Sequence, residues 1–435
     1  MMKMKRTISL LLSLLMLAAL AACGSQPQTE PETEPEQTEA PQEQAAARAG
    51  ELASPVLPEE SLYTEIDKSG LDAFAAESLP IVFADLNGEN RVYSPLNVYM
   101  ALAMLAEVTD GDSRAQLLEL LGEKDTDALR TEVKALFEAS YRDEELLTTL
   151  PAASVWMRDD CNYKSGALQA LAEYYFASAF SGTMGDPAYT AALHDWINER
   201  TNHLLEEQAE KLTLDSQTVL ALVTTLYFKG RWAEAFSEEQ TTQDVFHALS
   251  GDLQTDFMHK GMDMNYYRGE RFAAIRLSMH GGAGMWLLLP DEDSSLQELI
   301  DSGEAAAFLA DPEAAECTRY HVRISLPRFD VDSDLDLIPA LQKLGVTDVF
   351  TSAADFSPLT EELPLSVSQI EHAARVKIDE EGCEAAAFTA IFVKNAAIAD
   401  PLEEVEFTCD RPFFFAVTGD QGQLLFTGAV NTPNQ

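Results

Sequence analysis

The stretch from Asp379 to Ile398 constrains the fold most strongly, because it is apolar, rich in small residues and close to the C-terminus. It begins with acidic residues and a glycine, and Asp400-Pro401 follows it. Its side chains alternate between two faces, as those of a strand do. One face carries Cys383, Ala385, Ala387, Thr389, Ile391 and Val393, and the other carries Glu384, Ala386, Phe388, Ala390, Phe392 and Lys394. The first face is uncharged, which suits a strand buried in a sheet. An alanine-rich helix stays open, because alanine has the highest helix propensity.

The N-terminus predicts export. Basic residues within the first six positions precede an apolar run, Ile8 to Leu20, that is too short to span a membrane. Leu20-Ala21-Ala22-Cys23 resembles the lipobox of bacterial lipoproteins. We therefore expect residues 1–22 to be a lipoprotein signal peptide and Cys23 to carry a lipid that anchors an extracellular domain to the outer face of the bacterial cell envelope. A plain signal peptide with an accidental cysteine is the alternative.

Residues 23–60 are expected to form a tether, since positions 24–60 hold six prolines and nine glutamates against one arginine. The formal net charge of −44 excludes electrostatic binding to nucleic acid or to an anionic membrane surface. Membrane contact is thus expected through the lipid anchor alone. Residues 61–435 show neither a second linker nor a repeat, which predicts one domain with a substantial core. We expect this domain to be a monomer.

Hydrophobic periodicity predicts helices first and then mostly antiparallel strands, which indicates the α+β class. Helices are expected over 66–86, 95–108, 111–121, 126–139, 165–180, 191–208, 295–310 and 335–344. Strands are expected over 153–158 and 219–228, near Phe246, Phe257 and Tyr266, and over 272–277, 285–289, 322–329, 373–379, 405–407, 413–418 and 424–430.

The sequence lacks the common catalytic and metal-binding motifs. There is no Gly-x-Ser-x-Gly elbow and no β-lactamase motif set. His280-Gly281-Gly282 faintly resembles an esterase oxyanion loop, but a tight turn is the favoured interpretation. The seven histidines form neither His-x-x-x-His nor His-Glu-x-x-His. We expect no enzyme activity, no metal and no cofactor.

Several stretches of the chain together resemble the serpins. The hinge of that family combines two acidic residues, glycine, threonine or serine, glutamate, an alanine run and threonine. The matching segment is Glu380-Glu381-Gly382-Cys383-Glu384-Ala385-Ala386-Ala387-Phe388-Thr389. Further motifs in family order are Tyr93-Ser94-Pro95-Leu96, Tyr227-Phe228-Lys229-Gly230-Arg231-Trp232, Leu326-Pro327-Arg328-Phe329, 344–350, 355–357, 407–415 and 422–430.

The resemblance implies a single domain with about eight or nine helices, three β-sheets and an exposed reactive loop that inserts into the large sheet after cleavage. It implies a suicide-substrate inhibitor of serine proteases, with cysteine proteases as a further target class. The protease nucleophile forms an acyl bond to the loop. Insertion then distorts the protease site, and the covalent complex persists because deacylation needs that site intact.

The family's spacing from the hinge glycine implies a scissile bond at Ala396-Ala397. Small residues there suit elastase-like or subtilisin-like proteases. The second choice is Lys394-Asn395, which suits trypsin-like proteases.

The resemblance also assigns supporting roles in sheet opening. Arg328 and Glu380 match a basic–acidic pair at the top of the opening sheet, and Trp232 matches a tryptophan beneath it. Ser94 and His372 match a hydrogen-bonded cluster at the middle of the sheet.

Four residues depart from the family pattern. Asn97 stands where serine is common and Thr224 where asparagine is common, so we expect a rewired cluster. Cys383 replaces threonine or serine, and Phe388 is large for a hinge. A non-inhibitory binding protein on the serpin fold and a solute-binding lipoprotein stay open as other functions.

Overall fold

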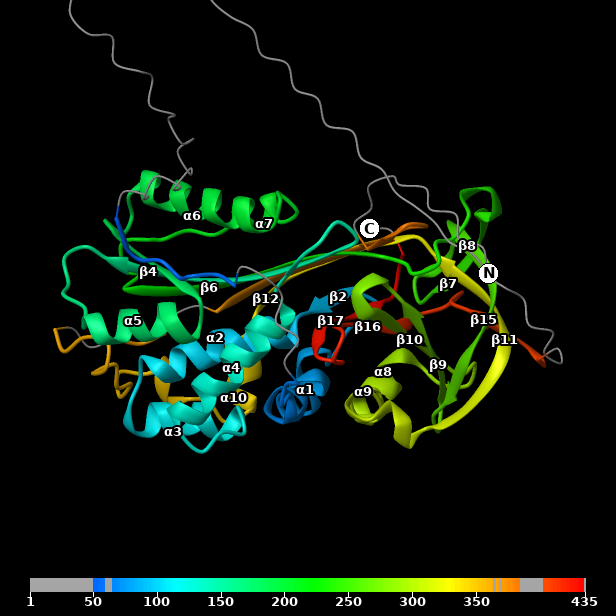
Figure 1. Ribbon diagram of the computed structural model, residues 1–435, viewed down its shortest axis with the longest axis horizontal. Coiled ribbons are helices and arrows are strands. Elements are labelled where there is room, and N and C mark those ends of the chain that lie inside the picture. Colours follow the sequence, from blue (N-terminus) through cyan, green and yellow to red (C-terminus); the bar gives the residue numbers. More distant parts are fainter. Residues whose placement is uncertain (1–49, 59–64, 363–364, 368–369, 384–401, 434–435) are drawn as a thin grey trace, which may run out of the picture. The chain divides into compact units, whose positions relative to one another are not determined.

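The computed structural model describes residues 50–58, 65–362, 365–367, 370–383 and 402–433. Helices pack against two sheets whose strands are mostly antiparallel, which confirms the α+β class (Figure 1). The helices are α1 (Ser69–Val82), α2 (Pro95–Glu107), α3 (Gly111–Leu120), α4 (Thr126–Ser140), α5 (Ser165–Tyr174), α6 (Pro187–Arg200), α7 (Glu206–Ala209), α8 (Leu296–Asp301), α9 (Glu304–Ala310) and α10 (Ile338–Lys343).

The first sheet has eight strands, and we call it the large sheet. Its hydrogen-bonded order is β1 (Glu51–Ala53), β5 (Ala177–Gly182), β4 (Leu147–Arg158), β6 (Leu220–Arg231), β14 (Gly382–Cys383), β13 (Glu371–Ile378) and β12 (Phe329–Asp336), with β3 (Arg142–Asp143) paired to β4. The two residues of β14 thus lie between two much longer strands.

The second sheet has nine strands. Its order is β15 (Glu404–Thr408), β11 (Glu316–Pro327), β8 (Gly251–Arg268), β9 (Phe272–Ser278), β10 (Gly284–Pro290), β16 (Phe413–Thr418), β17 (Leu424–Val430) and β2 (Arg91–Tyr93), with β7 (Thr242–Ala248) paired to β8. The described residues therefore form two hydrogen-bonded sheets and not the three expected. The long strand β8 pairs with β7, β11 and β9. It therefore joins into one sheet strands that would form two separate sheets if β8 were shorter.

Helices cover both faces of the large sheet. Helices α6 and α7 lie on one face, and α2, α4 and α5 lie on the other (Figure 1). The face under α6 has its own apolar cluster, which includes Trp156 of β4 and Trp196 of α6. The main core fills the space between the large sheet, the helices on its other face and the second sheet.

The expected tether ends earlier than residue 60. Residues 51–53 form β1, which pairs antiparallel with β5 at the edge of the large sheet. The Pro- and Glu-rich composition concealed this strand, because a three-residue strand has no measurable period of its own.

Three of the expected helices have different boundaries. The helix expected over 165–180 ends at Tyr174, because Phe176 has a left-handed backbone (φ 51°) and stacks its ring on Phe137 at 4.0 Å. Gly303, with φ 76°, divides the helix expected over 295–310. Positive φ angles at Asn202 and His203 likewise separate α6 from α7, so the described chain has ten helices where eight or nine were expected.

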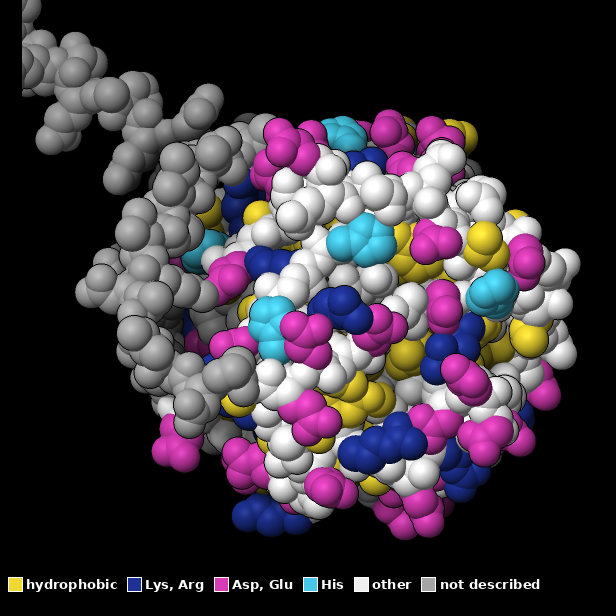
Figure 2. All heavy atoms as spheres, turned by 90° about the vertical axis from the view of Figure 1, so that its right-hand side faces the viewer, with side chains coloured by type: hydrophobic (Ala, Val, Ile, Leu, Met, Phe, Trp, Pro, Cys, Tyr) yellow, Lys and Arg dark blue, Asp and Glu magenta, His cyan; other side chains and the backbone are white. Residues whose placement is uncertain are grey.

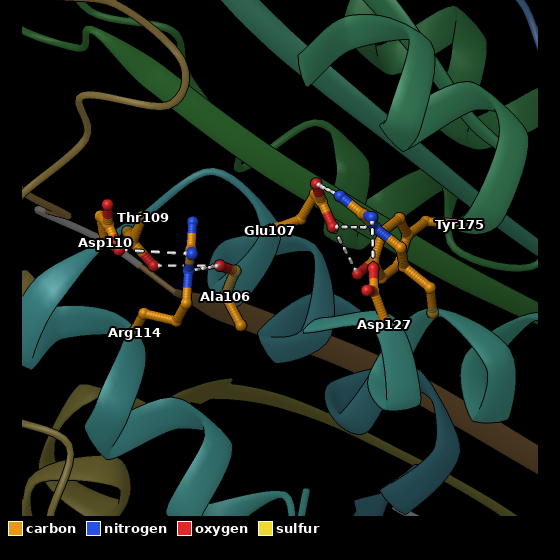
Figure 3. Close-up of polar contacts among 8 residues, drawn as sticks. Ala106, Glu107, Thr109, Asp110, Arg114, Asp127 and Tyr175 are labelled. Carbon is orange, nitrogen blue, oxygen red and sulfur yellow. Dashed lines mark hydrogen bonds and ion pairs between the residues drawn. The ribbon is translucent and has the colours of Figure 1, made fainter. Parts of the chain in front are cut away.

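A buried carboxylate joins the helices beneath the large sheet (Figure 3). Glu107, at the end of α2, accepts two hydrogen bonds from Arg130 of α4, at 2.6 and 2.8 Å. The Tyr175 hydroxyl donates to the same carboxylate at 3.0 Å, and the Arg130 guanidinium lies over the Tyr174 ring at 5.2 Å. Together these contacts fix α2, α4 and the end of α5 as one unit, here called the helix layer.

Candidate functional site

The candidate site is the place where β14 lies between β6 and β13, here called the central junction. Gly382 pairs with Arg231 and Cys383 with Gly230 of β6. On the other side, Cys383 pairs with Ile378 of β13. Within the described part of the chain, β6 and β13 form no ladder with each other and are connected through β14.

A tight turn delivers the hinge into the junction. The Asp379 N–H donates to the Gly382 carbonyl at 3.0 Å. The Asp379 carboxylate accepts the N–H of Glu381 at 2.9 Å. Trp232 holds the turn from below, since its indole N–H donates to the Asp379 carbonyl and its backbone N–H to the Glu381 carbonyl, both at 2.9 Å. The tryptophan that the resemblance assigned to this point therefore contacts the hinge directly.

Gly382 is required by its close approach to β6. Its φ of 154° lies in the region that side chains rarely adopt, and a Cβ added there would lie 2.1 Å from the Gly230 carbonyl oxygen. Any other residue would push the hinge away from β6.

Arg328 and Glu380 form the expected ion pair above the junction. The guanidinium binds the buried carboxylate in a fork, with Nε at 2.9 and 3.0 Å and Nη2 at 2.6 Å. The Thr241 hydroxyl donates to the same carboxylate at 2.5 Å. Burial acts to raise the pKa of Glu380, but the hydrogen bonds from Arg328 and Thr241 outweigh it and hold the pKa below its ordinary value. The pair fixes the first hinge residue in a charged, fully bonded state.

Sequence reasoning missed three groups at this turn. Thr241 binds Glu380, the Phe236 N–H donates to the Glu380 carbonyl at 2.9 Å, and Arg231 pairs with Glu381 at 3.1 Å. The one available signal was that Arg231 directly precedes Trp232 and carries the charge opposite to the acidic pair.

The mid-sheet cluster, which consists of Ser94, Asn97, Thr224 and His372, lies further along the junction. The Ser94 N–H donates to His372 Nε2 at 3.0 Å. Since Nε2 accepts, the neutral ring carries its proton on Nδ1. The Tyr93 ring packs edge-on against His372 at 5.5 Å, and burial lowers the pKa of His372 to about 4.

The two polar departures from the family pattern bind each other. Asn97 Nδ2 donates to the Thr224 carbonyl at 3.2 Å, and Thr224 Oγ1 donates to the Asn97 carbonyl at 3.3 Å. Ser94 caps α2 by accepting the Asn97 N–H at 3.3 Å. The start of α2 therefore contacts β6 through Asn97 and β13 through Ser94.

The remaining predicted site residues divide at Cys383. Its side chain is buried in the main core, on the face expected to turn inward. Glu384, Ala385, Ala386, Ala387, Phe388, Thr389, Lys394, Asn395, Ala396, Ala397 and the anchor residue Cys23 lie outside the described residues.

The face of the second sheet that carries β11 and β15 has mixed charge. Figure 2 shows Lys and Arg side chains interspersed with Asp, Glu and His on this side of the molecule. Arg323 pairs with Glu406 at 2.5 Å, and His321 with Asp263 at 2.7 Å. The described residues of this face thus offer no continuous basic surface.

Comparison with known proteins identifies the class of fold and site. The model of the family described as Serpin (serine protease inhibitor) matches residues 69–433. The chain belongs to the serpin family, whose members are generally protease inhibitors.

Relatives share this domain over nearly their whole length. Serpin-Z2A of Oryza sativa subsp. japonica is 29% identical over 418 residues, which cover 84% of this chain and 97% of the rice protein. Serpin B8 of Homo sapiens is 28% identical over 368 residues, with 83% and 97% covered.

Solved serpin structures match the fold. Native tengpin, a thermophilic serpin, has a TM-score of 0.76 at 25% identity and covers 87% of this chain and 97% of its own. Thyroxine-binding globulin in complex with thyroxine has a TM-score of 0.72 at 22% identity, with 84% and 99% covered, and shares the fold alone.

The described residues show neither a membrane-spanning helix nor a cluster of metal ligands. Among them, no helix combines the length and hydropathy needed to cross a membrane. The same residues contain no group of three or more His, Cys, Asp or Glu side chains placed to hold a metal ion.

The buried neutral His372 makes stability depend on pH. Its pKa is about 4 in the folded protein against an ordinary 6.5, so the unfolded chain binds a proton first. Stability is therefore full above pH 6.5 and declines by about 3 kcal/mol as the pH falls to 4. We expect the urea midpoint of the protein to fall over this window.

His372→Gln keeps an acceptor for the Ser94 N–H but does not titrate, so its urea midpoint should be flatter between pH 6.5 and 4. His203→Gln, at an exposed position, is the matched control and should keep the wild-type slope. Equal slopes in all three proteins would exclude His372 as the source.

Proposed function

We propose that this serpin inhibits serine proteases of the elastase-like or subtilisin-like type, and in principle cysteine proteases, by trapping the acyl-enzyme through insertion of its reactive loop. The observation that supports this most is the central junction. Two hinge residues already lie as a strand between β6 and β13, which are otherwise unjoined in the described chain.

The covalent step is ordinary acyl transfer. The protease hydroxyl or thiol attacks the carbonyl carbon of Ala396, and its proton passes through the protease base to the departing amine. The bond to Ala397 breaks, and the hinge side of the loop stays attached to the protease as an acyl group. That side is then no longer connected to the residues that follow Ala396, so it is able to enter the sheet.

The register of β14 defines where an inserting strand would lie. Cys383 pairs with Gly230 and with Ile378. Continued in the same antiparallel register, Thr389 falls opposite Thr224, in the rung that crosses the mid-sheet cluster. It shares the inward face of Cys383 there, so its hydroxyl can take up hydrogen bonds that the parting strands lose.

The same register reaches Leu220, the first residue of β6, at Val393. Both candidate bonds lie beyond that point, since Lys394 and Ala396 follow Val393 in the chain. Either cut frees enough chain to run the length of β6. The choice of Ala396 therefore depends on the family's spacing and on the small side chains that surround it.

We expect the mature protein to form a covalent adduct with elastase-like or subtilisin-like proteases that survives denaturing electrophoresis. The mass of the released C-terminal peptide should show that this peptide begins at Ala397. Ala396→Arg should transfer inhibition to a trypsin-like protease, whereas Lys394→Ala should leave elastase inhibition unchanged. Clean cleavage without adduct for every protease would instead support a non-inhibitory binding protein.

Gly382→Ala tests the junction itself. The added Cβ would lie 2.1 Å from the Gly230 oxygen, so it should push β14 away from β6, and an inserting strand would then lack its paired start. Displacing the hinge costs about 1–3 kcal/mol, which slows insertion by roughly 5- to 150-fold. The variant should be cleaved as a substrate, with less adduct per mole of protease. Gly345→Ala, at φ 95° but with no atom within 4 Å of the added Cβ, is the control and should inhibit normally.

We propose further that Cys23 is lipidated and holds the domain at the outer face of the cell envelope, supported by the apolar run and the Leu20-Ala21-Ala22-Cys23 sequence. Cys23→Ser should then move the protein from the membrane fraction to the soluble fraction and abolish fatty-acid labelling. Retention of both properties in the variant would exclude the anchor.

A further inference from the structure

Residues 50–58, here called the N-terminal clip, are built into the large sheet although they lie outside the family match at 69–433. Their strand β1 pairs with β5. The Ser181 N–H donates to the Gly50 carbonyl at 2.8 Å. Gly50 has φ 92°, and a Cβ there would lie 2.2 Å from the Ser181 oxygen, so this seat accepts glycine alone.

Leu57 fastens the other end of the clip. It packs against the main core and lines a cavity of about 80 Å³ together with Leu150 of β4, Trp196 of α6 and Phe176, at the corner between α5 and β5. It also borders an open groove whose far wall is formed by α4 and α5. The neighbouring Val56 is 88% exposed, so Leu57 carries the apolar contact at this end.

The clip therefore touches two bodies that sheet opening must move apart. One body is the strand group β5, β4 and β6, together with α6 on its outer face. The other is the helix layer, in which Glu107 and Arg130 join α2 to α4 (Figure 3). The helix layer is also tied to β13, because Ser94 at the start of α2 binds His372.

A new strand at the central junction widens the sheet by one strand spacing, about 4.8 Å. The strands β6, β4 and β5 then move away from β13 while the helix layer stays bound to β13 through Ser94. These strands must slide across the helices beneath them. The clip crosses this sliding surface, since it is hydrogen-bonded to β5 and packed against the corner where α5 meets that strand.

We propose that the N-terminal clip restrains opening of the large sheet and so controls how fast the reactive loop enters it. The link to inhibition rests on the proposed function, but the restraint itself is a property of the sheet. A segment that precedes the family domain thus helps to prolong the lifetime of the native state.

Hydrogen–deuterium exchange on the full mature chain tests the restraint without any protease. Leu57→Ser and Gly50→Ala weaken the clip from opposite ends, so either one decides the result if the other fails to fold. We expect exchange to rise about tenfold in β6 and β13, which corresponds to about 1.4 kcal/mol of opening free energy, and to stay unchanged in β16 and β17.

Two matched variants serve as controls. Val56→Ser changes the exposed neighbour of Leu57, and Gly303→Ala adds a Cβ at φ 76° with no atom within 4 Å. Both should exchange like the wild type. Faster exchange confined to residues 50–58 and β5, an equal rise in β16 and β17, or an equal rise in the controls would each overturn the proposal.

A failed clip and a failed function give different results. If the protein forms adducts but the clip variants exchange normally, only the clip is excluded. If no protease gives an adduct and exchange in the clip variants still rises in β6 and β13, the clip proposal is supported and the inhibitory function is excluded.

Discussion

The two-residue strand β14 is the contact on which the rest of the structure depends. It connects β6 to β13 in the described chain through its pairing with Arg231 and Gly230, and Gly382 permits this pairing because a side chain there would clash with the Gly230 carbonyl. Strand edges need hydrogen-bond partners, from another strand or from water. A sheet joined through so short a strand can accept more of the same strand with no change in its register. The insertion that we propose would therefore extend a ladder that the native sheet already contains.

The polar groups around the junction stabilise the native sheet unevenly, strongly at the hinge turn and weakly in the middle of the sheet. The Glu380 carboxylate is buried, so removing Arg328 alone would leave an unpaired charge, which makes such pairs costly to break. Asn97 and Thr224 share two longer hydrogen bonds, each worth about 1 kcal/mol. The turn at the top is thus firmly fixed, whereas the middle of the sheet is held by contacts that separate more easily. That order suits a sheet that must open below a fixed hinge.

The resemblance to serpins assigned Glu380 and Gly382 to the hinge and Arg328 and Trp232 to its support, because each belongs to a short motif of consecutive residues. In the structure Arg328 binds Glu380, and Trp232 donates to the Asp379 carbonyl. Sequence reasoning failed where distant parts of the chain decide the outcome. The break of the expected helix at Phe176 depends on the Phe137 ring, and the strand at residues 51–53 depends on the free edge of β5. Neither partner is visible in a local window of sequence, so periodicity alone could not find them.

Weak contacts of this kind can control a trap because the control is kinetic. Extending β14 along β6 would add ladder hydrogen bonds over most of the length of that strand, whereas opening the sheet breaks the Asn97–Thr224 hydrogen bonds and the clip contacts and leaves Ser94 bound to His372. Under the proposed trapping mechanism the inserted state is favoured at equilibrium, and the lifetime of the native state is set by the contacts that must break first. A change of about 1.4 kcal/mol in any one of them alters the rate about tenfold. The clip at residues 50–58 and the pair Asn97–Thr224 are therefore the positions where this chain can adjust its rate while keeping the hinge that its family shares.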